Sequence, residues 1–198
     1  AMVTAFSGNS FDNIEAPLIQ IHPDAVASLS PITSTNNLDE VILVMGGDTV
    51  SDGAWLDLSV PYETFGYVYI LSAITVEAGV TLLMGDDLAL YVEDEGTLVL
   101  DGTAGAHVSV TSAQAAPSAG DWRNIEIHDS ASTGNRFSFT DFGFGGATGG
   151  AVSYGMLFVD ELAEVTLDNV TFSNASTCDV YQDGTISATN TTYDLCPH

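Results

Sequence analysis

Carboxylates are the most frequent ionisable groups in this sequence, so they are the first candidates for chemistry. Runs of them stand at Asp86-Asp87, at Glu93-Asp94-Glu95 and at Asp160-Glu161. A glycoside hydrolase needs two carboxyl groups that face one cleft, one of them kept protonated. Neighbouring residues of a strand point to opposite faces, and Glu93 and Asp160, which share a place in a repeated phrase, are expected several repeats apart. Solvated corners explain the runs more simply, and we assign no catalytic residue.

The charge balance gives the acidic residues two interpretations. The sequence has 27 acidic residues, two arginines and no lysine, for a formal net charge of −25. Mutual repulsion that keeps the surface soluble explains such an excess. The alternative is that some carboxylates hold Ca²⁺, which prefers oxygen ligands. The residues that we assign to this metal site are Asp86, Asp87, Glu93 and Asp94.

The scarcity of Lys and Arg argues against binding to nucleic acid or anionic membranes and against a lyase reaction. Binding nucleic acid or an anionic membrane requires clustered Lys and Arg, and Arg123 and Arg136 stand alone. A lyase of uronate polymers would need one of them as its base. We instead expect Arg123 to pair with a nearby acid such as Asp121 or Glu126, and the negative charge of the chain would repel a polyuronate.

The four histidines match no catalytic motif. His128-Asp129 has the form of the orienting half of a triad, but no Ser or Cys stands in a recognisable nucleophile motif. A strand end that faces solvent is the simpler interpretation of this pair.

Aromatic residues concentrate between positions 137 and 158, beside a Gly-rich stretch. Phe137 and Phe139 alternate as core residues do. We assign Phe142, Phe144 and Tyr154 to an exposed platform on which a sugar ring stacks. The alternative is a buried aromatic layer.

A phrase that occurs three times identifies the elements that hold these groups. Its copies are Leu90–Gly102, Leu157–Asn169 and Val180–Asn190, taken without gaps, with a weaker fourth copy at Ile74–Gly85. Val92, Val159 and Val180 are assigned the same place in each copy. Such self-similarity is typical of a solenoid, whose units stack on their neighbours.

Within each copy the apolar residues alternate, which predicts short strands with one face inward. Corners are expected at Gly85, Gly102, Asn169 and Asn190, because Gly and Asn adopt a left-handed backbone at the least cost. Strand, corner, strand, corner at this period predicts a parallel β-helix. Threonines such as Thr97 and Thr185 are too sparse for a regular ice-binding face, which stays a minor alternative.

Two cysteines, Cys178 and Cys196, are separated by about one coil of such a solenoid. Stacked coils would bring their side chains together, so we predict a disulfide that pins the C-terminal end and indicates an oxidising compartment. Two free thiols, or a metal site, are the alternatives.

The repeat predicts two parts, residues 1–37 and residues 38–198. The first lacks the phrase; Ala1-Met2 looks like a cloning remnant, and Pro23–Ser28 predicts a short helix that caps the open end of the solenoid. The second is the β-helix, with regular coils from about Val41–Val44. Stretches rich in Gly, Ala and Pro at 113–120 and 143–151 are expected to be loops that leave the coil.

Five stretches together resemble right-handed parallel β-helix repeat proteins of bacterial cell surfaces. They are Ile74–Leu82, Leu90–Leu98, Asp101–Thr103, His107–Ser112 and Gly120–Ile127, and the resemblance covers about residues 55 to 190. The resemblance implies the right-handed sense of the coil and an exported, modular surface protein. It implies no particular activity.

We therefore predict an all-β chain, a single right-handed parallel β-helix with an N-terminal capping segment. The function expected is that of a non-catalytic extracellular or cell-surface module, a structural scaffold or a part for adhesion to a polysaccharide or cell-surface glycan, joined to other domains of its parent protein. The alternative is a carbohydrate-active enzyme, a polysaccharide lyase or glycoside hydrolase, which would show carboxylates, or an Arg and a metal, converging on a bound sugar.

Overall fold

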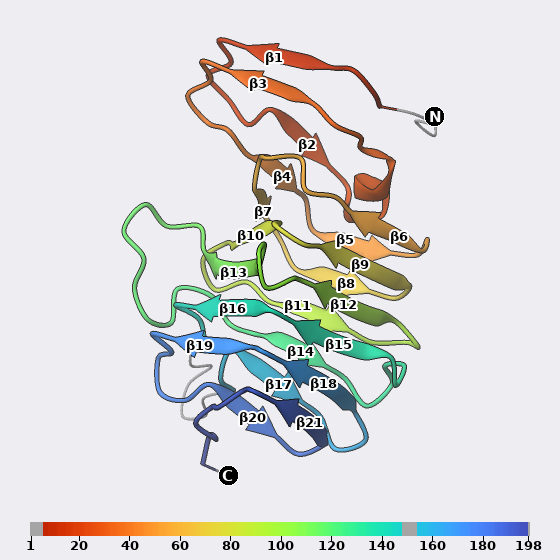
Figure 1. Ribbon diagram of the computed structural model, residues 1–198, viewed down its shortest axis with the longest axis vertical. Helices are drawn as coiled ribbons and strands as arrows, with labels where there is room; N and C mark the ends of the chain where they lie inside the picture. The colour runs from red at the N-terminus through yellow and green to blue at the C-terminus, as the bar shows by residue number, and fades with distance from the viewer. Residues whose placement is uncertain (1–5, 148–153, 198) are drawn as a thin grey trace.

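The computed structural model describes residues 6–147 and 154–197 (Figure 1). Strands dominate this part of the chain, and its one helix is the 3-10 helix η1 (Pro23–Ser28). All strands of the ladders are short and pair in parallel. The prediction of an all-β chain built from stacked parallel strands is confirmed at this level.

Three parallel sheets form the body of the molecule. Sheet 1 contains β2 (Ile19–Ile21), β4 (Ile42–Val44), β7 (Tyr62–Thr64), β10 (Thr81–Met84), β13 (Val108–Ser112), β16 (Thr140–Gly143) and β19 (Thr171–Ser173). Sheet 2 contains β5 (Gly47–Thr49), β8 (Val68–Ile70), β11 (Leu90–Val92), β14 (Ile125–Ile127), β17 (Leu157–Val159) and β20 (Val180–Gln182). Sheet 3 contains β6 (Gly53–Trp55), β9 (Ala73–Glu77), β12 (Thr97–Asp101), β15 (Asn135–Ser138), β18 (Glu164–Asp168) and β21 (Thr185–Thr189). A separate parallel pair, β1 (Ser10–Asp12) and β3 (Thr33–Thr35), lies at the N-terminal end.

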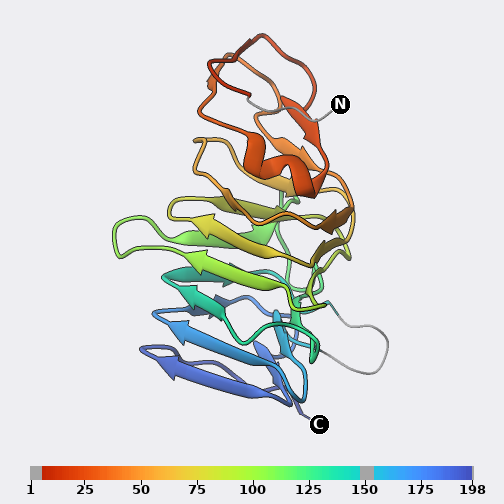
Figure 2. The same ribbon diagram turned by 90° about the vertical axis from the view of Figure 1, so that its right-hand side faces the viewer.

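From β4 onward the chain visits the three sheets in the same order, and we call one such circuit a coil. The coils stack in the order of the sequence, from the N-terminal to the C-terminal end (Figure 2). Pairing is in register: Leu90 of β11 pairs with Val68 of the preceding coil and with Ile125 of the next. Each position of a coil therefore recurs as a column along the stack.

The interior columns consist of aliphatic and aromatic side chains. In sheet 2 the first residue of each strand from β8 onward is at most 1% exposed. These residues are Val68, Leu90, Ile125, Leu157 and Val180. Burial of an aliphatic side chain of this size stabilises the fold by roughly 1.5–3 kcal/mol, so the columns hold successive coils together.

The predicted register of the third copy of the repeated phrase is wrong by two residues. Val180 pairs with Leu157 rather than with Val159, so it does not share the place of Val92. The copies are not gapless either, since four residues separate β17 from β18 and only two separate β20 from β21. Gly184 permits the shorter corner, because a Cβ atom there would lie 2.2 Å from a carbonyl oxygen of the preceding coil.

The fourth copy, Ile74–Gly85, is also assigned wrongly. It contains β9 and β10, which belong to sheets 3 and 1, whereas Leu90–Gly102 contains β11 and β12 of sheets 2 and 3. Apolar residues alternate in the same way in all three sheets. The pattern alone therefore does not tell one corner of the coil from another.

The four predicted corner residues fall into two physical classes. Asn169 and Asn190 have left-handed backbones, with φ of 55° and 49°, as predicted. Gly85 and Gly102 do not. At Gly102 a Cβ atom would lie 2.2 Å from the carbonyl oxygen of Phe139, so this glycine permits close approach of two coils rather than an unusual φ.

The short helix predicted at Pro23–Ser28 is present as η1, and it packs against β5 and β6, the first strands of sheets 2 and 3. Val26 is 1% exposed. The Asp24 carboxylate accepts hydrogen bonds from the backbone N–H groups of Val50 and Ser51, both at 2.8 Å. Strand β2, which lies within the segment 1–37, pairs with β4 and extends sheet 1. The Ala1-Met2 pair lies outside the described residues.

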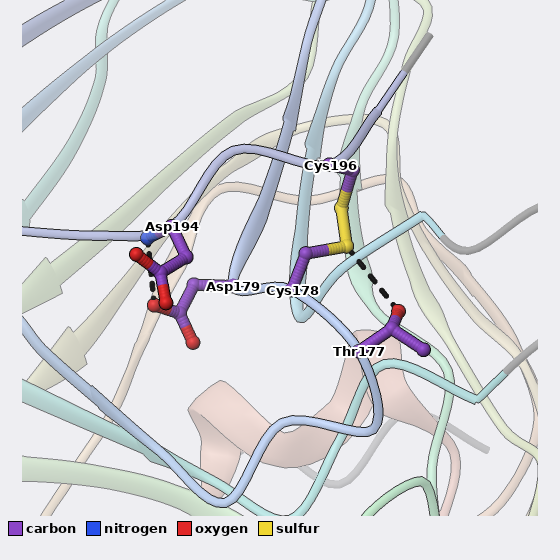
Figure 3. Close-up of a disulfide and its surroundings, with 5 residues drawn as sticks. All are labelled: Thr177, Cys178, Asp179, Asp194 and Cys196. Carbon is purple, nitrogen blue, oxygen red and sulfur yellow. Dashed lines mark hydrogen bonds between the residues drawn. A yellow bond between two sulfur atoms is a disulfide. The ribbon is translucent and has the colours of Figure 1, made fainter.

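The predicted disulfide between Cys178 and Cys196 is present, with 5.1 Å between the Cα atoms (Figure 3). It ties the C-terminal segment to the corner that precedes β20. Beside it, the Cys196 N–H donates to the carbonyl oxygen of Val180 at 2.9 Å, and the Asp194 N–H donates to the Asp179 carboxylate at 2.9 Å. Residues 194–196 therefore lie beside the start of β20.

Of the two predicted loops, 113–120 and 143–151, only the first lies entirely within the described residues. Residues 113–120 lie between β13 and β14, as predicted. Of the predicted loop at 143–151, Gly143 ends β16, and residues 148–151 lie outside the described part. None of the described residues belongs to a helix of the length and apolar character that crossing a membrane requires.

Replacing both cysteines with serine (C178S/C196S) is expected to lower the free energy of unfolding by about 3 kcal/mol, because the bond constrains the unfolded chain. The two residues are 18 positions apart. Urea denaturation of the variant and of the oxidised protein, followed by circular dichroism, measures the difference. Dithiothreitol should move the wild-type midpoint to that of the variant and leave the variant unchanged; identical midpoints throughout would contradict the prediction.

Candidate ligand-binding face

The outer face of sheet 2 carries aromatic and acidic side chains in one line. The middle residue of each strand points away from the core, because successive side chains alternate between the two faces. In-register pairing stacks these middle residues about 4.8 Å apart. From β5 to β20 they are Asp48, Tyr69, Tyr91, Glu126, Phe158 and Tyr181. We call this line the aromatic column.

Two pairs of rings in the aromatic column are stacked. The ring centres of Tyr69 and Tyr91 lie 5.3 Å apart with 17° between the planes, and those of Phe158 and Tyr181 lie 4.8 Å apart with 6° between the planes. Tyr154, which is 38% exposed, meets both rings of the second pair edge-on, at 5.3 and 5.9 Å. All four rings are partly exposed, so the column presents two stacked ring pairs on one face, and we call these pairs the ring platforms.

Glu126 lies between the two platforms, in register with Tyr91 on one side and Phe158 on the other. Its side chain is 20% exposed. Burial raises the pKa of this carboxyl; the charges of two neighbouring carboxylates add to the effect, while His128 opposes it. The protonated form of Glu126 is therefore favoured more than that of an exposed carboxyl group.

A second line of ionisable groups follows the C-terminal ends of the same strands. Its members are Glu93, His128, Asp160 and Asp183, and we call them the acidic row. Backbone hydrogen bonds hold it in register: His128 donates to the strand end before Glu93 at 2.9 Å, and Asp160 donates to the strand end before His128 at 3.0 Å. The expectation that Glu93 and Asp160 lie several coils apart is wrong, because a single strand, β14, lies between theirs.

His128 is the one base among these acids. Its Nε2 lies 3.5 Å from Glu126, and its Nδ1 lies 3.3 Å from Asp129 and 3.8 Å from Asp160. Burial alone would lower the pKa of His128, but a hydrogen bond with Asp129 and the charges of Glu126, Asp160 and Glu93 outweigh it and raise the pKa. The imidazolium is thus favoured beside the carboxylates, and the His128-Asp129 pair faces acids rather than a nucleophile.

The structure does not bring the four predicted metal ligands together. Asp86 and Asp87 precede β11, whereas Glu93 and Asp94 follow it, so the two pairs lie at opposite ends of one strand. Within residues 6–147 and 154–197, the one convergent group of three such ligands is His128, Asp129 and Asp160, whose atoms lie within 4.8 Å of one another.

Asp87 is engaged by Arg123. The guanidinium Nε and Nη2 donate to the two carboxylate oxygens, each at 2.8 Å, and this hydrogen bonding holds the pKa of Asp87 below its usual range. Arg123 therefore pairs with an acid, as expected, but the partner is Asp87 and not Asp121 or Glu126, the examples given above. The guanidinium also lies 5.7 Å from the ring centre of Tyr67, so it packs at the edge of the candidate face and is not free to serve as a base.

The predicted sugar platform is corrected in part. Phe142 is 1% exposed and stacks inside the coil on Phe172, with 5.1 Å between ring centres, so it cannot meet a ligand. Phe144 is half-buried beside the loop, in a left-handed backbone with φ of 65°. Tyr154 alone of the three adjoins the aromatic column.

The principal residues of the candidate face are not among the predicted site residues, although the sequence carries a signal for them. In four of the three-residue strands of sheet 2 the middle residue is aromatic. These strands are Val68-Tyr-Ile, Leu90-Tyr-Val, Leu157-Phe-Val and Val180-Tyr-Gln. An aromatic residue at the outward position of successive coils indicates a column on the surface. Glu126 interrupts it at the corresponding place of Ile125-Glu-Ile.

Replacing Asp160 with asparagine is expected to lower the pKa of His128, because the substitution removes one of the charges that raise it. The raised pKa means that the ion pairs of His128 stabilise the fold at acidic pH, and that this contribution is lost as the pH rises through the folded-state pKa. Proton NMR titration of the imidazole C2 signals measures the change. Asp141→Asn, beside His107 on sheet 1, is the matched control; an equal shift of His128 in both variants would contradict the assignment.

Comparison with known proteins was made at three levels. No model of a protein family, no curated protein and no solved structure matches the chain. The candidate face therefore rests on the residues and geometry described above.

Proposed function

We propose that the chain forms a single right-handed parallel β-helix of an exported bacterial surface protein, and that it binds a polysaccharide or a cell-surface glycan along the outer face of sheet 2 without catalysis. The parallel stacking of the coils supports the first part, and the disulfide fits an oxidising, extracellular compartment. Other domains of the parent protein would then use this module for adhesion.

One observation carries the proposal: the two ring platforms of the aromatic column lie in one line on the surface. Stacked rings across strands stabilise a sheet, but large aromatic side chains that serve packing alone contribute most when they are buried. Here four rings of one face remain partly exposed. A chain of pyranose rings has the flat apolar faces that suit such platforms, and its hydroxyl groups suit the carboxylate between them.

A second candidate function is glycoside hydrolysis, and one observation favours it. Glu126 is a largely buried carboxyl with a raised pKa, and Asp160 lies on the other side of His128. A protonated carboxyl beside an ionised one is the arrangement that such hydrolysis requires. A lyase is not favoured, because Arg123 is held by Asp87 and Arg136 by Asp101.

Removing a ring from either platform is expected to weaken glycan binding about fivefold to tenfold, since an aromatic contact contributes about 1 kcal/mol or more. The variants are Tyr91→Ala and Tyr181→Ala. Isothermal titration calorimetry with hexamers of glucose, N-acetylglucosamine, glucosamine and galacturonate measures binding to the wild type and to each variant.

Phe65→Ala is the matched control, because this ring is 64% exposed and lies at the corner between β7 and β8, outside the aromatic column. Its binding should equal that of the wild type. Failure of all four hexamers to bind, or an equal loss in the control, would refute the proposal. Release of new reducing ends by the wild type and not by Glu126→Gln would instead establish the hydrolase.

A further inference from the structure

We infer that the aromatic column selects oligosaccharides that carry protonated amino groups, such as glucosamine oligomers, over their neutral and acidic counterparts. This inference rests on the proposed glycan-binding function and names its class of ligand. The position of the carboxylates relative to the ring platforms carries it.

The face between the platforms is negatively charged whether its one base, His128, is neutral or protonated. Four carboxylates surround His128, so even the imidazolium neutralises only one of them. They are Glu93, Glu126, Asp129 and Asp160. The nearest arginine, Arg123, is already paired with Asp87. A positively charged ligand is thus complementary to this surface, whereas the negative charge of a uronate would be repelled.

The carboxylates are also partly buried from solvent, which strengthens their ionic interactions. The side chains of Glu126 and Asp160 are 20% and 29% exposed. Ionic interactions at partly buried groups are screened less by water and salt than those at exposed groups. Net surface charge alone would attract any cation weakly, whereas these two groups offer a specific partner.

The spacing of the strands puts that partner beside a stacked sugar. Glu126 lies one strand from Tyr91 and one strand from Phe158, and adjacent strands are about 4.8 Å apart, which is close to the width of a pyranose ring. A sugar bound beside Tyr91 or Phe158 would therefore lie within about one strand spacing of Glu126. An ammonium group offers three donors and the carboxylate has acceptor sites for them. N-acetylation removes the charge and keeps the ring.

Calorimetric titration at low ionic strength with hexamers of glucosamine and of N-acetylglucosamine tests the inference. The glucosamine hexamer is expected to bind the wild type about tenfold or more tightly than the acetylated hexamer, since hydrogen bonds to charged groups exceed neutral ones. Added salt should weaken the binding of the charged hexamer only. Galacturonate hexamers should not bind.

The variant Glu126→Gln keeps the shape of the side chain and removes its charge. It is expected to lose about tenfold or more in affinity for the glucosamine hexamer and to keep its affinity for the acetylated one. Glu63→Gln is the matched control, because Glu63 is likewise the middle residue of its strand, on sheet 1, and its loss changes the net charge equally. Asp160→Asn provides a second test if the Gln variant does not fold.

The outcomes separate this inference from the proposed function. Equal affinity for the two amino-sugar hexamers, or an equal loss in Glu63→Gln, overturns the selection of cationic sugars while glycan binding stands. If no hexamer binds, the proposed function fails. Spermine is the remaining probe: if it displaces the glucosamine hexamer with equal affinity, the carboxylates capture amines without the platforms, which also overturns the inference.

Discussion

In-register parallel pairing between successive coils is the constraint on which the rest of this structure depends. Because each strand bonds to the same part of the next coil, one position of the coil becomes a column of side chains along the whole stack. Inside, the column that contains Leu90 and Ile125 forms part of the core. Outside, the same pairing lines up the rings of Tyr69 and Tyr91. Core and candidate face thus arise from one arrangement of hydrogen bonds.

In-register pairing also places carboxylates of successive coils close to one another. Basic side chains beside them reduce the repulsion. A coil repeat that places acids at the end of each sheet 2 strand would stack carboxylates one above another. His128 interrupts that line between Glu93 and Asp160, and its pKa is raised by the acids around it. At the opposite end of β11, Arg123 pairs with Asp87 of the preceding coil. Of the few bases in this very acidic chain, His128 and Arg123 thus each lie against a carboxylate of a neighbouring coil.

The corner residues and the disulfide were predictable from the sequence, whereas the register in which strands of successive coils pair was not. Asn169 and Asn190 were identified as corners, and Cys178 and Cys196 as a pair, because backbone preference and loop length act locally. Val180 was misplaced because the number of residues in a corner varies, and alternation looks the same in every sheet. The candidate site depends on that register, so the meeting of Glu126 and His128 with Asp160 could not be foreseen.

The ends of the stack bear on the candidate face as well. Sheet 2 is closed at its first strand by η1, which packs on β5, and at its last strand by the C-terminal segment, where Leu195 bridges to Val180 of β20 and the disulfide secures the contact. A platform that is fixed before its ligand arrives loses little conformational entropy on binding. The covers that protect the ends of sheet 2 from edge-to-edge pairing also restrain β5 and β20, the first and last strands of the sheet that carries the aromatic column.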